Sequence, residues 1–180
     1  MFAPAAIFAQ RRDHLTGAEI ELIRDQQSID GRMEIYLKAI DRRLMVLNND
    51  QTNAKQVERD AGKWGELPKG TRAQLLSDIE KILDESISKI DDVAAHDAKN
   101  KLIPVAVNIL ADGVNRLMPE LKAQLDKAAD QKERGAMLNA VDFCNQIVEA
   151  SAKVPKMSEK ERKKLQKEVQ KETEKAQQSN

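Results

Sequence analysis

Hydrophobic residues recur every three or four positions along four long stretches of the chain. The clearest stretch places Met33, Tyr36, Ile40, Leu44 and Leu47 on one face. Similar rows run from Leu76 to Val93, from Ile103 to Ala128 and from Met137 to Val148. This spacing is typical of amphipathic helices with one buried face. No comparable run alternates between polar and apolar residues, so the pattern predicts an all-helical protein.

Capping residues and helix breakers predict where these helices begin and end. The segment Thr16-Gly17-Ala18-Glu19 has the form of a capping box, which predicts a short first helix that weakens at 28–31. The second helix follows from Ile29 and ends at Asn48-Asn49-Asp50. Thr71 is expected to cap the next long helix, and Pro155 to stop the last core helix, over about 131–152.

The principal connection is predicted at residues 48–70, which contain most of the helix breakers. A short helix over 54–61 fits inside this connection, and Trp64 is expected to cover one end of the bundle.

The most apolar segment, 103–128, keeps its helical spacing across Pro119. A proline inside a helix removes one hydrogen bond and clashes with the carbonyl four residues earlier. Because the spacing stays in phase, we expect one kinked helix or two helices stacked end to end, and no domain boundary. This segment is predicted to be the central element.

The predicted fold is therefore all-α: an antiparallel bundle of four to five helices with a polar C-terminal helical extension. We divide the chain into an apolar N-terminal segment at 1–15, the bundle at 16–154 and a polar, mildly basic tail at 155–180. The tail is expected to be a solvated helix or a partly ordered extension that is too polar to join the core.

Charge and composition narrow the classes of partner. The chain has 30 basic and 30 acidic residues, but residues 151–180 carry a net charge of +4, so the rest carries −4. Aromatic residues make up only 3% of the chain, too few for a platform that stacks bases. Glutamates are interleaved with Lys163, Lys164, Lys167 and Lys171 in the tail. We therefore expect no nucleic-acid partner. For the tail, a solvated extension or a helix that pairs with an unidentified protein partner is favoured over binding to anionic lipid.

No group of residues in the sequence has the pattern of a catalytic, cofactor or metal site. His96 follows Asp92 by four residues and could share a helix face with it, but two ligands are fewer than a zinc site requires. The only other histidine is His14. Cys144 is in register with Met137 and Val148, which favours an inert buried thiol over a nucleophile. We therefore predict no enzymatic activity, no cofactor and no metal.

The segment 65–71 approaches the pattern of a phosphate-binding loop. Gly65 and Gly70 have the required separation and a helix follows, but the lysine after the second glycine is missing and no strand precedes the loop. We interpret the segment as a loop that enters a helix.

The first nine residues are apolar and end in Ile7-Phe8-Ala9. They have two interpretations: the remnant of a signal peptide with Gln10 as the mature terminus, or an apolar arm that docks on the bundle. The single cysteine is compatible with either a reducing or an oxidising compartment. No stretch reaches the ~18 consecutive apolar residues that a transmembrane helix requires.

The block HLTGAEIELIRDQQSIDGRMEIYLKAIDRR, from His14 to Arg43, resembles the opening of uncharacterised exported bacterial proteins. The resemblance implies a periplasmic or secreted location and no particular activity; a cytoplasmic location is the alternative. Together these features favour a non-enzymatic, exported helical bundle with an interaction or structural role. The alternative is a bundle that binds a ligand or a metal.

Overall fold

The computed structural model describes residues 12–50 and 54–178, and seven helices and no strand lie within these ranges. The predicted segment Met1–Ala9 lies outside the described residues. The helices are α1 (Gly17–Asp25), α2 (Ile29–Leu47), α3 (Ala54–Trp64), α4 (Arg72–His96), α5 (Ile103–Asp126), α6 (Gln131–Ser151) and α7 (Glu159–Gln178). The all-helical fold predicted from periodicity is confirmed.

Side-chain caps fix the beginnings of several helices. Thr16 and Glu19 form the predicted capping box of α1: the Thr16 hydroxyl accepts from the Glu19 amide, and the Glu19 carboxylate accepts from the Thr16 amide. Thr71 caps α4 in the same way with Gln74. Such boxes satisfy amides that have no partner within the helix. The short helix expected over 54–61 extends three residues further, to Trp64.

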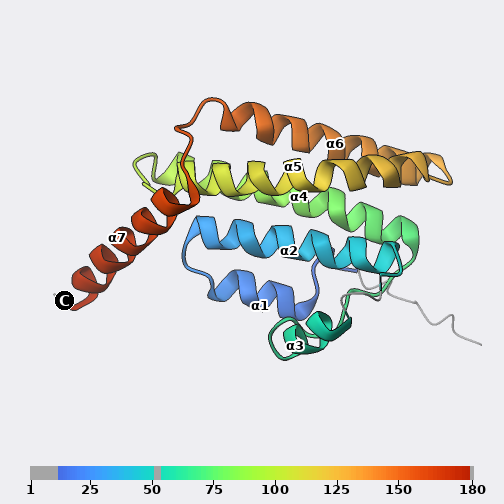
Figure 1. Ribbon diagram of the computed structural model, residues 1–180, viewed down its shortest axis with the longest axis horizontal. Helices are drawn as coiled ribbons and strands as arrows, with labels where there is room; N and C mark the ends of the chain where they lie inside the picture. The colour runs from blue at the N-terminus through green and yellow to red at the C-terminus, as the bar shows by residue number, and fades with distance from the viewer. Residues whose placement is uncertain (1–11, 51–53, 179–180) are drawn as a thin grey trace, which may run out of the picture.

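The bundle is a ring of α2, α4, α5 and α6, in which α2 and α6 each pack against both α4 and α5. Ring helices that follow one another in the chain run in opposite directions, so α2 and α5 run parallel, as do α4 and α6 (Figure 1). Helix α1 lies beside α2, and α3 lies beside α1. The core consists of the rows predicted from spacing, including Met33, Tyr36, Ile40, Ile79, Leu83, Leu110, Leu117 and Met137.

Helix α5 packs between α2 and α6 in this ring and continues without interruption past Pro119. Pro119 lies on an exposed position, as does Asn115, whose carbonyl loses its helical partner, so water can solvate that carbonyl. Near the middle of α5, a Cβ added at Gly113 would come within 2.3 Å of a methyl group of Leu37. The close approach of α2 and α5 therefore depends on the glycine.

Helix α7 lies outside the ring and crosses one end of it (Figure 1). Leu165 and Val169 are partly buried against the core, and Gln166 donates to Asp30 Oδ2 at 2.6 Å. The expectation that the tail is too polar to join the core therefore needs correction, since one face of α7 packs against it. None of the described helices is both long and apolar enough to cross a membrane.

Candidate functional site

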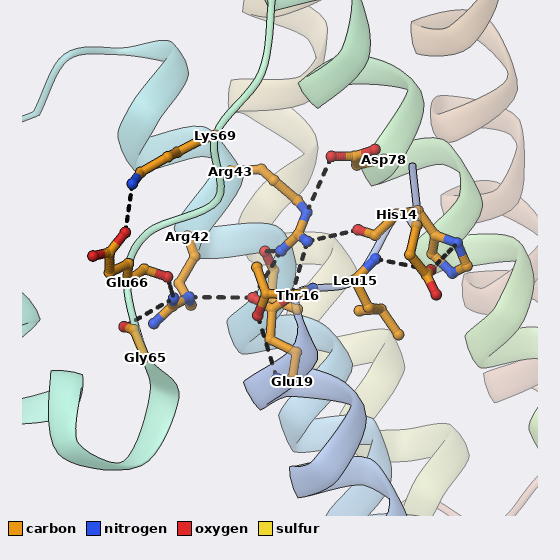
Figure 2. A network of polar contacts seen from close by, with 12 residues as sticks. His14, Leu15, Thr16, Glu19, Arg42, Arg43, Gly65, Glu66, Lys69 and Asp78 are labelled. Atoms are coloured by element: carbon orange, nitrogen blue, oxygen red, sulfur yellow. Dashed lines mark hydrogen bonds and ion pairs between the residues drawn. The ribbon is translucent and has the colours of Figure 1, made fainter. Parts of the chain in front are cut away.

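The largest group of buried charges lies where α1, α2 and α4 meet the loop before α4. Glu19, Arg42, Arg43 and Asp78 are each at most 3% exposed. We call these four residues and Arg12, which binds Asp78, the charge clamp. Figure 2 shows the side chains of Glu19, Arg42, Arg43 and Asp78 converging from segments that are far apart in the sequence.

Arg43 and Glu19 form the centre of the charge clamp. The two terminal nitrogens of Arg43 donate to the two carboxylate oxygens of Glu19 at 2.9 and 2.8 Å. The same nitrogens also donate to the backbone carbonyls of Ala39 and His14 at 2.7 and 2.6 Å (Figure 2). Such a two-pronged pair fixes orientation as well as distance. Glu19 thus belongs to the capping box of α1 and binds α1 to α2.

Arg42 connects the same carboxylate to α3 and the following loop. Its Nε lies 3.2 Å from Glu19 Oε1, and its guanidinium group lies 5.7 Å from the centre of the Trp64 ring. It also donates to the carbonyls of Gly65 and Glu66 (Figure 2). Burial lowers the pKa of Arg42, and the neighbouring Glu19 carboxylate acts in the opposite direction. Trp64 therefore covers an arginine beside the bundle.

Arg12 and Asp78 close the other side of the charge clamp. Arg12 donates to both Asp78 oxygens at 2.7 Å and to the Lys69 carbonyl at 2.9 Å. Asp78 Oδ2 also lies 3.8 Å from Arg43 Nε. The loop that resembled a phosphate site therefore directs three carbonyls, those of residues 65, 66 and 69, at arginines. A phosphate loop directs amide N–H groups at its ligand, so this loop has the opposite polarity.

A second polar group lies beside the charge clamp and involves His14. Its Nε2 lies 2.6 Å from Glu85 Oε2, and the Tyr36 hydroxyl donates to Glu85 Oε1 at 2.8 Å. Because a carboxylate accepts hydrogen bonds, His14 Nε2 is the donor. The hydrogen bond from His14 lowers the pKa of Glu85 despite partial burial. Burial and the Glu85 carboxylate raise the pKa of Tyr36.

The residues considered from sequence are not brought together. His96 lies exposed at the end of α4. Its Nδ1 lies 2.7 Å from the backbone carbonyl oxygen of Asp92, so its partner is the backbone of Asp92 and not the carboxylate. Cys144 is fully buried in the core, and burial raises the pKa of its thiol to about 12. Among the described residues, no group of three or more His, Cys, Asp or Glu side chains is arranged to hold a metal ion.

Sequence reasoning missed the charge clamp. On the helix that carries the row from Leu76 to Val93, Asp78 is buried and Glu85 binds His14 and Tyr36, and the spacing of apolar residues indicates neither contact. One feature of the sequence did indicate a buried charge. Arg43 comes three residues after Ile40 and seven after Tyr36, so it lies on the apolar face of its helix.

The charge clamp joins residues 12–25, α2, α4 and the loop 65–71, and its charged groups are directed at one another. Such an arrangement fixes the relative positions of these segments. Comparisons with known protein families, with curated proteins and with solved structures find no match for this chain.

Proposed function

We propose that this protein is a non-enzymatic, exported interaction protein in which a rigid bundle presents α7 to a partner. The observation that carries the proposal is the placement of α7 outside the ring. Its four partly buried residues, Arg162, Leu165, Gln166 and Val169, lie at helical spacing on one face, and the described residues around them are exposed. A helix held by one narrow face leaves the remaining surface available for binding.

The burial of Cys144 and the pairing of His14 with a carboxylate support a non-catalytic role. Cys144 is enclosed in the core with a raised thiol pKa, and His14 is occupied by Glu85. The charge clamp uses its carboxylates to neutralise arginines, which is a structural use of buried charge. The resemblance of the block 14–43 to exported proteins supports the proposed location.

Cross-linking from α7 tests the proposed role. A photoreactive group attached at Lys167→Cys, on the exposed side of α7, should form an adduct in cells of the source organism. The matched control is Lys122→Cys, which is exposed on α5. Adducts at 167 and not at 122 support the proposal, whereas equal or absent adducts at both positions contradict it. Cys144 does not interfere because it is buried.

Mass spectrometry of the natural protein tests the location. We expect a processed chain in the exported fraction. An unprocessed chain beginning at Met1 in the cytosolic fraction would contradict export without affecting the role of α7.

The second candidate is a ligand-binding bundle, and one observation favours it. Asp30 is 2% exposed and its Oδ1 has no hydrogen-bond partner, although it lines a groove of about 810 Å³ between α7 and the α1–α2 connection. Glu34 lines the same groove, and its pKa is raised by burial and then by Asp30. A buried acceptor beside a second carboxylate favours a ligand with a positively charged amine.

Calorimetric titration with putrescine, a simple diamine, tests this candidate. Binding that is lost in Asp30→Asn and retained in Asp92→Asn, an exposed control on α4, would support it. No heat of binding to the unmodified protein would exclude this ligand class.

A further inference from the structure

The surface of α7 that faces away from the bundle is a stripe of lysines. At about 100° per residue, six lysines fall within an arc of about 120°. They are Lys160, Lys163, Lys164, Lys167, Lys171 and Lys175, and all six are exposed. The arc lies opposite Leu165 and Val169, which contact the core. We call these six residues the lysine stripe; the glutamates that interleave with them in the sequence mostly lie on other sides of the helix.

The acidic residues of α7 flank the lysine stripe on both sides. Glu161, Glu168 and Glu172 lie on one side and Glu159 on the other, at about 80–120° from its centre. Within the arc the only described carboxylate is Glu174, at its edge, where Gln170 donates to it at 3.1 Å. Two flanking glutamates pair with lysines of the stripe, Glu159 with Lys163 and Glu168 with Lys164. The field is therefore positive along the centre of the stripe and is weakened at its flanks by these pairs.

We propose that the lysine stripe docks the protein on a flat anionic surface, a bilayer that contains acidic phospholipids. This inference names the partner of α7 and rests on the proposed function. Clusters of four to eight basic residues along a helix are typical of binding to acidic lipids. The stripe is about 22 Å long and lies on a convex helix, so a plane can reach its six lysines together.

The flanking glutamates favour a plane over a nucleic-acid groove. A helix in the major groove has phosphates on both sides, and these would meet the acidic flanks of the stripe. A plane touches only the central arc and leaves the glutamates in solvent. The chain also lacks aromatic residues on α7 that could stack on bases.

The composition of the stripe also argues against a protein partner at this face. Protein interfaces are depleted of lysine and are anchored by aromatic residues, methionine and arginine. Helix α7 contains no aromatic residue or methionine, and its arginine, Arg162, is partly buried and binds Asp112. Lysine is a compact, strongly hydrated charge that suits diffuse attraction to many headgroups. Because Leu165 and Val169 are occupied by the core, docking is electrostatic and involves no insertion of α7.

Co-sedimentation of the full chain with vesicles tests the proposal. The vesicles consist of phosphatidylcholine alone or of phosphatidylcholine with about one third phosphatidylglycerol. We expect binding to the mixed vesicles only, and release at about 0.5 M salt, where screening is strong.

Two matched triple variants identify the surface responsible. Lys164→Gln/Lys167→Gln/Lys171→Gln should reduce partitioning on the order of a hundredfold, because each lysine near the surface contributes a factor of about five. Lys122→Gln/Lys127→Gln/Lys132→Gln removes the same charge at the other end of the bundle (Figure 1) and should change partitioning by less than about threefold. Glutamine has nearly the helix propensity of lysine, so both variants should keep the circular dichroism of the unmodified protein.

Three results would overturn the inference: no preference for the mixed vesicles, equal losses in the two variants, or retardation of duplex DNA through the stripe without vesicle binding. A protein adduct at position 167 without vesicle binding would leave the proposed function standing and would reject only the lipid partner.

Discussion

At the scale of single residues, we expect substitution of a buried charged side chain to lower the stability of this protein the most. Glu19 is the common partner of Arg42 and Arg43, and it also completes the cap of α1. Removing one member of a buried ion pair costs more than the pair contributes, because the remaining charge has lost both water and its partner.

Glu19→Gln should therefore lower the free energy of unfolding by about 3–5 kcal/mol. Glutamine preserves the shape of the side chain and can still accept from the Thr16 amide, so the loss isolates the missing charge. The control is Glu21→Gln, which removes an exposed pair with Arg24 and should cost less than about 1 kcal/mol. Urea unfolding measures both. Equal effects of the two substitutions would contradict the role of the charge clamp.

Glu85 makes stability depend on pH in the acid range. Its pKa in the folded protein is lowered from 4.5, first by the hydrogen bond from His14. A group with a depressed folded pKa stabilises the protein above its unfolded pKa, and this contribution is lost as the pH falls through the folded value. The stability difference between the unmodified protein and Glu85→Gln should therefore be largest above about pH 5 and shrink below 4.5. A difference that grows with acidity would contradict this assignment.

Cys144 should be inert in the folded protein. Its thiol is fully buried, and its pKa is raised to about 12, so little thiolate exists at pH 8 and reagents have no access. Reaction with a thiol reagent should be at least about a hundredfold slower in buffer than in denaturing urea. Equal rates would show that the core opens around α6.

At the scale of elements, α5 contains an internal proline that does not cap either end of the helix. Pro119 is exposed within a continuous helix, so Pro119→Ala restores a hydrogen bond to the carbonyl of Asn115. We expect the free energy of unfolding to rise by about 1–3 kcal/mol. Thermal unfolding followed by circular dichroism measures the change. A lower stability would mean that the packing of α5 requires the local geometry that the proline imposes.

Helix α7 and the segment that contains α1 should differ in their importance for folding. A chain that ends after residue 157 loses the partly buried Leu165 and Val169, which corresponds to about 1–3 kcal/mol, and should still unfold cooperatively. A chain that begins after residue 25 loses Glu19 and should fail to fold, because Arg42 and Arg43 lose the carboxylate that they share and Arg43 keeps only the longer contact with Asp78. The opposite order of effects would contradict this division of roles.

At the scale of the whole molecule, local features could be predicted from the sequence and distant ones could not. Helix periodicity, the Thr16 capping box and the continuity across Pro119 depend on residues within a few positions of one another. The charge clamp joins Arg43 to Glu19 across 24 positions and Arg12 to Asp78 across 66. Spacing along one helix cannot show such partners, and Asp78 had the same appearance as a solvated residue.

The arrangement of charges on the tail also could not be predicted from the sequence alone. Its net charge of +4 was visible in composition, but the interleaved glutamates hid the segregation of lysines onto one side. That segregation became clear once Leu165 and Val169 showed which side of α7 faces the bundle. The orientation of α7 against the ring thus converts a mildly basic tail into a directed surface.

Hydrogen–deuterium exchange of the full chain, with and without vesicles that contain phosphatidylglycerol, tests the central claim most directly. We expect amides of α7 to exchange at least about tenfold more slowly with vesicles, and amides of α4 and α5 to exchange at unchanged rates. Protection confined to the ring, or no protection of α7, would contradict the claim that the bundle presents α7 to an anionic surface.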